Sequence, residues 1–443
     1  MYRKFAAISL CMLFIAGMAE ARVVSARARA NLPLVVDSAL DEPDTAPGDG
    51  QCHSTPSGQC TLRAAIQEAN TLSGVDNITF AITGTISFFS EIIITDSVSI
   101  TGPGADLLTL NPNYGSSGSS LWFDKMGGAF TLAGLRLSGN HTVGGLYLFH
   151  GALTIANVVV ENTGTPSGLV IVNADTQTTV TRSRFSHNNS PSAGAISIIA
   201  GHVTIADSTI SENTSTVSAG GISNGLGDVN ILNSAIISNT TGIPEIAARG
   251  GGLSNGGTMR LVNSTVSGNS SRNNPAASGG GLANSGTLTV SSSTIANNRS
   301  TTGNGGGLRI ISGTVTLQNT IIANNLAGGD CSQAGGVIVD AGHNLVRDNS
   351  CGFMGGADPM LGAIQGKGGP TPIQALLAGS PAIDGGNPAG CSSGLGSVLA
   401  FDQRGFFRAF DGDGNGSAIC DIGAFEYHST PPSVWIELPL IAR

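Results

Sequence analysis

The segment Gly220-Gly221-Ile222-Ser223-Asn224 opens a unit that the chain repeats three more times. The copies are Gly251-Gly252-Leu253-Ser254-Asn255, Gly280-Gly281-Leu282-Ala283-Asn284 and Gly306-Gly307-Leu308. Their apolar anchors, at 222, 253, 282 and 308, lie 31, 29 and 26 residues apart. A repeat of this length indicates a stacked solenoid.

The residues between these copies predict strands. Apolar and polar residues alternate, as in Thr287-Leu288-Thr289-Val290, and a period of two is that of a strand. Val, Ile and Thr favour strands, and Gly and Asn tolerate the left-handed backbone of tight corners. Short strands between such corners describe one coil of a parallel β-helix.

An Asn closes each coil, and we expect these residues to stack as a ladder in which each amide bonds the turn of its neighbour. This pattern supports the fold and says nothing about activity. The closing residues are Asn140, Asn162, Asn188, Asn213, Asn239, Asn269, Asn298 and Asn324.

Composition narrows the class of protein. The 443 residues include 64 Gly and only 11% charged residues, which fits a turn-rich all-β chain. The net charge of −9 argues against nucleic acid, which rewards basic surfaces, and against anionic lipid.

The N-terminus predicts export. Arg3 and Lys4 precede an apolar run that ends near Ala19-Glu20-Ala21, so residues 1–21 form a predicted signal peptide. The run is too short to span a membrane comfortably, and no later segment could cross one. We therefore predict a secreted or cell-surface protein.

Six cysteines remain outside that leader, and an even number in a secreted chain indicates disulfides. Their distribution favours local pairing, whereas a zinc site would need tighter spacing and nearby His. The predicted bonds are Cys52–Cys60, Cys331–Cys351 and Cys391–Cys420.

Residues 61–70 hold the one convincing helix. Thr61 can act as the N-cap, and Leu62, Ala65, Ile66 and Ala69 form one apolar face. A solenoid must cover its open end, and this helix is the expected plug. Arg63 and Glu68 could be catalytic, but bonds to the turns around the plug explain them more simply.

The same region resembles a known family. Gly48-Asp49-Gly50-Gln51-Cys52 followed by Cys60-Thr61-Leu62-Arg63-Ala64-Ala65-Ile66-Gln67-Glu68-Ala69-Asn70 resembles the CSLREA motif of bacterial secreted proteins, with departures at Thr61 and Ala64. In that family the motif precedes a right-handed β-helix related in architecture to pectate lyases. No activity attaches to the motif.

A second resemblance covers residues 329–427, where four motifs follow one another in order. The series is similar to the "choice-of-anchor Q" domain of bacterial surface proteins and implies an extracellular protein. Residues 428–443 contain no sortase site, hydrophobic tail or final basic cluster, so the resemblance does not extend to an anchor. The motifs are Gly366-Lys367-Gly368-Gly369-Pro370-Thr371-Pro372, Gly379-Ser380-Pro381-Ala382-Ile383-Asp384-Gly385-Gly386-Asn387, Asp402-Gln403-Arg404-Gly405-Phe406 and Asp421-Ile422-Gly423-Ala424-Phe425-Glu426-Tyr427.

One motif suggests a metal. Asp411-Gly412-Asp413-Gly414-Asn415-Gly416 matches the first half of a calcium loop, with oxygens at alternate positions and Gly at the sixth. Position twelve is Ile422, so the usual Glu is absent, and Asp421 comes one residue early. The predicted ligands of a structural calcium ion are Asp411, Asp413, Asn415 and Asp421; the alternative is an acidic hairpin turn. No other cofactor is predicted.

One row of side chains could carry chemistry. Aligning the coils on the closing Asn places Glu161, His187 and Glu212 in a column, with the two carboxylates about 10 Å apart. That separation resembles an inverting glycosidase, with Arg182 and Arg184 nearby. The alternative is a set of solvated residues at a strand end. Asp207 is expected to be a corner residue.

These observations predict an all-β fold: a right-handed parallel β-helix with an N-terminal capping helix and a disulfide-braced C-terminal cap. The expected divisions are 1–21, 22–125, 126–328, 329–427 and a tail, 428–443.

The leading function is a monomeric, non-catalytic adhesion or glycan-contact scaffold whose partner is an extracellular polysaccharide or a host or cell-surface glycan. One alternative is a polysaccharide lyase or glycoside hydrolase using Glu161, His187 and Glu212, although 5% aromatics and two Trp argue against sugar stacking. The other is a structural spacer.

Overall fold

The computed structural model describes residues 33–114, 119–139, 141, 143–242, 249–272, 279–301, 304–353, 356–394 and 396–429. The predicted signal peptide, Asn140 and residues 430–443 of the tail lie outside the described residues. Across the described residues, no helix is both long enough and apolar enough to cross a bilayer.

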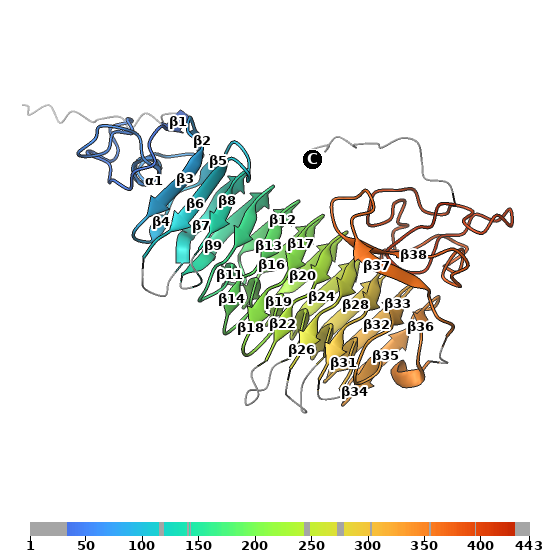
Figure 1. Cartoon of the computed structure of the whole chain (residues 1–443). Helices are drawn as coiled ribbons and strands as arrows, with labels where there is room; N and C mark the ends of the chain where they lie inside the picture. The colour runs from blue at the N-terminus through green and yellow to red at the C-terminus, as the bar shows by residue number, and fades with distance from the viewer. Residues whose placement is uncertain are drawn as a thin grey trace, which may run out of the picture.

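The chain winds into stacked coils whose strands pair in parallel with those of the next coil (Figure 1). The predicted all-β parallel solenoid is therefore confirmed. A typical coil holds β19 (Ile222–Asn224), β20 (Asp228–Leu232), β21 (Ala235–Ile237) and β22 (Thr240–Thr241). Each pairs in register with its counterpart one coil later.

The four strand positions build long stacks. The first position contains β4 (Ile92–Ile94), β11 (Leu169–Ile171), β15 (Ile196–Ile198), β23 (Leu253–Asn255), β27 (Leu282–Asn284), β31 (Leu308–Ile310) and β34 (Cys331–Gln333). The second contains β1 (Pro33–Val36), β2 (Asp76–Phe80), β5 (Val98–Thr101), β12 (Gln177–Thr181), β16 (His202–Ala206), β24 (Thr258–Val262), β28 (Thr287–Ser291), β32 (Thr314–Gln318) and β35 (Val337–Asp340). Two longer strands, β7 (Ser119–Ala133) and β9 (Gly144–Ala156), span both positions.

The strands at the third and fourth positions also stack from coil to coil. The third contains β3 (Gly84–Phe88), β6 (Leu108–Pro112), β8 (Arg136–Ser138), β10 (Val159–Glu161), β13 (Arg184–Ser186), β17 (Thr209–Ser211), β25 (Thr265–Ser267), β29 (Thr294–Ala296), β33 (Ile321–Ala323) and β36 (Leu345–Val346). The fourth contains β14 (Asn189–Ser190), β18 (Thr214–Ser215), β26 (Ser270–Ser271) and β30 (Arg299–Ser300).

The solenoid runs one coil further than predicted. Strands β34, β35 and β36 pair in register with β31, β32 and β33, so the coils reach Val346 and the expected boundary at residues 328 and 329 falls too early. The last coil was missed because it lacks the Gly-Gly and closing-Asn signals of its predecessors.

An amide ladder runs through the interior, as predicted, but two of its members differ. Asn188, Asn213, Asn239, Asn269 and Asn298 are buried, and each amide bonds both the backbone N–H and the side chain of its neighbour. The next member is Asn325, whereas Thr163 takes the position before Asn188. Asn162 and Asn324 instead occupy left-handed corners, with φ of 56° and 59°.

The N-terminal end is closed as expected. Helix α1 (Leu62–Ala69) is capped by Thr61, whose side chain accepts the Ala64 N–H. Arg63 pairs with Asp41 at 2.7 Å, and buried Glu68 accepts backbone N–H groups of residues 48 and 50. Both charged residues therefore bond the turns around the plug.

The C-terminal cap, defined as residues 356–427, lies along the side of the last coils (Figure 1). It contains β37 (Leu361–Gln365), which pairs antiparallel with β38 (Ile373–Leu376). A second apolar cluster joins Ile321 of β33 to Ile422 and Phe425 of the cap. The disulfides Cys52–Cys60, Cys331–Cys351 and Cys391–Cys420 have the expected pairing.

Candidate functional site

The predicted column of Glu161, His187 and Glu212 is wrong at its first member. Glu161 is in register with Ser186, the residue before His187, and Ser186 is in register with Ser211. The alignment slipped by one residue because Asn162 was taken for a ladder amide when it is a corner residue. Glu161 and Glu212 therefore do not form the expected pair of carboxylates two coils apart in one column.

Glu161 is held by arginines. Its Oε1 lies 2.5 Å from Nη1 of Arg136, and its Oε2 lies 3.3 Å from Nη2 of Arg184. The Glu161 side chain is only 16% exposed. Both oxygens of the Glu161 carboxylate already have a cationic partner on an adjacent coil. The carboxylate therefore links adjacent coils and has no free oxygen for a substrate.

His187 and Glu212 do stack, as expected. His187 Nε2 lies 2.5 Å from Glu212 Oε2, and the two side chains are 56% and 54% exposed. Both residues have left-handed backbone, with φ of 56° and 57°. They form an exposed His–Glu pair at a corner, and such exposed pairs contribute about 0 to 1 kcal/mol.

A groove of about 410 Å³ lies between the coils and Pro370 of the cap. Arg182, Arg184 and Asp207 contribute to its wall. Asp207 is the corner residue expected from sequence, with φ of 50°. Burial raises the pKa of its carboxyl, opposed by a hydrogen bond from Asn233 and the charge of Arg182. An acid with a raised pKa beside cations can exchange a proton with a bound ligand.

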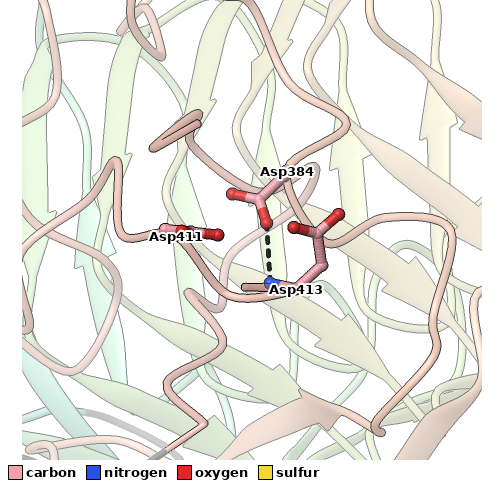
Figure 2. Close-up of side chains that lie close together, drawn as sticks. All are labelled: Asp384, Asp411 and Asp413. Carbon is pink, nitrogen blue, oxygen red and sulfur yellow. Dashed lines mark hydrogen bonds between the residues drawn. The ribbon is translucent and has the colours of Figure 1, made fainter. Parts of the chain in front are cut away.

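The acidic motif forms a carboxylate cluster with a different membership from the prediction. Oxygens of Asp384, Asp411 and Asp413 all lie within 4.8 Å of one another, and Figure 2 shows the three side chains gathered together. Asp384 comes from the segment before Cys391, which no spacing rule linked to the motif. Asp421 is not a member of this cluster.

Hydrogen bonds within the loop support the hairpin-turn alternative. The Asp411 carboxylate accepts the backbone N–H groups of Gly414, Asn415 and Gly416. The Asp384 carboxylate accepts those of Gly412 and Asp413. Asn415 faces Asp413 through its amide N–H, so its oxygen is directed elsewhere. Burial and the charge of Asp413 raise the pKa of Asp384.

Asp421 belongs to a buried charge network beneath the cluster. Its two oxygens accept the N–H groups of Asp384 and Tyr427, at 2.8 and 2.5 Å. Burial, together with the charge of Glu426, raises the pKa of Asp421 to about 8. Burial also raises the pKa of Glu426, against the opposing effect of Arg408.

These shifts predict that the stability of the cap falls as pH rises. A carboxyl whose pKa is higher in the folded state binds its proton more tightly there, so its contribution is complete below about pH 4 and is lost as pH approaches about 8. One proton corresponds to a slope of about 1.4 kcal/mol per pH unit. Urea midpoints measured from pH 4 to 9 should decrease, and Asp421→Asn should flatten the profile. A midpoint that rises over this range would contradict the assignment.

Comparison with known proteins supports the fold alone. No family model and no curated protein matches the chain. Among solved structures, the crystal structure of pectate lyase Pel9A matches with a TM-score of 0.56 and 16% sequence identity, over 90% of this chain and 97% of that one. This similarity establishes a pectate lyase-like β-helix.

Proposed function

We propose that this protein is an extracellular or cell-surface scaffold that contacts glycans without cleaving them. The observation that carries the proposal is a column of outward-facing hydroxyl and amide side chains at one position of successive coils. Its members, which are half-buried or exposed, are Thr131, Thr154, Thr179, Thr204 and Asn230. Neighbouring coils are about 4.8 Å apart, so the column offers regularly spaced donors and acceptors to an extended polar chain.

Two further observations support this reading. Among the predicted catalytic groups, Glu161 is held in ion pairs with Arg136 and Arg184, and His187 and Glu212 contact each other. Three disulfides, with the predicted signal peptide, are typical of an oxidising compartment outside the cytosol.

A second candidate function is a carbohydrate-active enzyme, a polysaccharide lyase or glycoside hydrolase, and the groove favours it. Arg182 and Arg184 could hold an acidic sugar while Asp207 exchanges a proton. In this alternative the acid that exchanges the proton is Asp207 in the groove, and not Glu212, which lies on an exposed corner.

One pair of assays separates these functions. The purified chain is applied to an array of plant and microbial oligosaccharides and, in parallel, to the matching polysaccharides in a reducing-end assay. We expect binding without release of reducing ends. Cleavage by wild type that Asp207→Asn abolishes would replace the scaffold with the enzyme, and an absence of both binding and cleavage would leave the structural spacer.

We also propose that the acidic cluster binds a structural calcium ion. Two observations support it: the alternating oxygens of the sequence motif, and the convergence of Asp384 on Asp411 and Asp413 from another segment. Three gathered carboxylates repel one another, and a hard cation with oxygen ligands relieves that repulsion.

Calcium is therefore expected to raise the melting temperature of the cap. A ligand at 100 times its dissociation constant stabilises the folded state by about 2.7 kcal/mol. Thermal unfolding is compared in excess calcium and in EDTA, with Asp384→Asn as the ligand variant and Asp358→Asn, outside the cluster, as the control. Equal melting temperatures for wild type in both buffers would rule out the ion and leave the hairpin turn.

A further inference from the structure

Aromatic side chains gather at one place on the outside of the early coils. Trp122 of β7 and Tyr147 of β9 are opposite each other in register, and their rings stack with centroids 4.1 Å apart and planes inclined at 22°. Phe149 lies 6.1 Å from Trp122 and 6.5 Å from Tyr147. We call these three residues the aromatic platform. All three are half-buried, so each ring retains exposed surface.

The strand geometry explains why these rings point outward. Leu121 and Phe123 flank Trp122 and are fully buried, as are Leu146 and Leu148 beside Tyr147. In this pleat the intervening residues point to the outer face of the coils. Phe149 is an extra residue on β9, because Phe123 pairs with Leu148 and Asp124 pairs with His150. Such a bulge redirects side chains and is frequent beside binding sites.

A polar rim adjoins the platform. Asp124 Oδ1 lies 2.8 Å from His150 Nδ1, and His150 Nε2 lies 3.1 Å from Asn173 Nδ2. Because Asn173 also donates to the Phe149 carbonyl, its amide nitrogen faces His150, and Nε2 of His150 is the acceptor. Nδ1 of His150 then donates to Asp124. The Oδ2 of Asp124 has no partner among the described residues and can accept a hydroxyl.

The surroundings of the platform also differ from the rest of its column. The same outward position is Ile93 on the preceding coil, which is 51% exposed, and Val170 and Ser197 on the following coils. The rings therefore lie between Ile93, which is exposed, on the preceding coil and the smaller Val170, which is buried, on the next coil. In the described part of the cap, the hydrogen bonds and apolar contacts to the coils involve residues such as Asn233, Asn263 and Ile321, which lie on later coils than the platform.

We propose that the aromatic platform and its rim form a binding subsite for neutral pyranose units of a glycan. Ring faces attract polarised C–H groups, and a few placed polar groups beside an apolar surface fix the orientation of a ligand. The charge of the rim selects against uronates: Lys125 is already paired with Asp96, and Asp124 leaves the rim negative. The inference rests on the proposed glycan-contact function and names the site and the sugar class.

Intrinsic fluorescence tests the site with the platform intact. The sequence has two tryptophans, Trp122 and Trp435, so Trp435→Phe leaves Trp122 as the single reporter. The full chain is first applied to an array of neutral and acidic oligosaccharides. The tightest neutral binder is then titrated into the Trp435→Phe protein. We expect the emission of Trp122 to change during the titration, and the dissociation constant fitted to that change should equal the one measured by calorimetry.

Substitutions complete the test. Trp122→Ala should weaken binding of that oligosaccharide by about tenfold or more, whereas Trp122→Tyr should retain most of it. Phe407→Ala removes an exposed ring that pairs with Phe401 in the cap and should have no effect. Melting curves confirm that each variant folds.

The outcomes separate the inference from the function on which it rests. Neutral glycans that bind wild type and Trp122→Ala equally, without changing Trp122 emission, would overturn the subsite and leave the glycan-contact scaffold standing. Binding of acidic glycans alone would overturn the assignment of sugar class. No binding to any glycan would overturn the proposed function and the subsite together.

Discussion

Replacing Asn239 with alanine is expected to lower the free energy of unfolding by about 3 to 5 kcal/mol, because each buried polar group left without a partner costs about 1 to 3 kcal/mol. The Asn239 side chain is fully buried. Its oxygen accepts the backbone N–H and the amide of Asn213, at 3.0 and 2.9 Å. Its nitrogen donates to the Ile210 carbonyl and to the Asn269 oxygen. Alanine would leave groups on both neighbouring coils unsatisfied.

Asn189→Ala provides the matched control. This residue lies in β14, is exposed, and makes no side-chain hydrogen bond within the described part of the chain. A surface substitution of this kind changes stability by about 0.5 kcal/mol or less. Urea unfolding followed by circular dichroism compares the two variants. Similar midpoints for both would show that the ladder does not hold the coils together.

The same ladder explains why the sequence predicted the fold but misplaced one candidate row. Asn suits two adjacent positions for different reasons: the left-handed corner and the buried amide that follows it. Asn162 and Asn297 take the corner, whereas Asn188 and Asn298 take the ladder. Alignment by residue type cannot separate these roles. The error left the fold prediction intact but moved Glu161 into the wrong column.

Local signals predicted local features well. The cap of α1 and the short-range disulfides depend on residues close together in sequence, so spacing alone was sufficient. The contact of Asp384 with Asp411 could not be predicted in this way, because the two residues belong to separate irregular segments of the cap. No periodicity relates such segments, and only tertiary packing brings them together.

Composition was also a poor guide to the candidate glycan site. An aromatic content of 5% argued against sugar stacking, but that average assumes that the rings are spread evenly. The structure instead places Trp122, Tyr147 and Phe149 in contact on one face. The usable signal was the alternation within the two strands, which directs Trp122 and Tyr147 outward between buried neighbours.

Arg408→Ala is expected to release the cap from the coils and to cost about 3 to 5 kcal/mol, the range found when one partner of a buried ion pair is removed. The Arg408 and Glu426 side chains are 1% and 0% exposed and lie 3.4 Å apart. Nη2 of Arg408 also donates to the Asn263 oxygen at 2.6 Å and to the Gly423 carbonyl at 2.8 Å. One guanidinium thus joins a coil corner to two parts of the cap.

Two comparisons isolate this role. Arg408→Lys retains the charge but loses the planar set of donors, so we expect it to restore only part of the stability. Arg347→Ala removes an exposed partner of Asp358, with side chains 48% and 51% exposed, and should cost about 1 kcal/mol or less.

Limited proteolysis followed by mass spectrometry reports on the cap. In Arg408→Ala, cleavage should concentrate within residues 356–427 while the coils stay protected, because the solenoid keeps its own core of inward side chains. Uniform cleavage of coils and cap would show instead that they unfold as one unit and that Arg408 stabilises the whole chain.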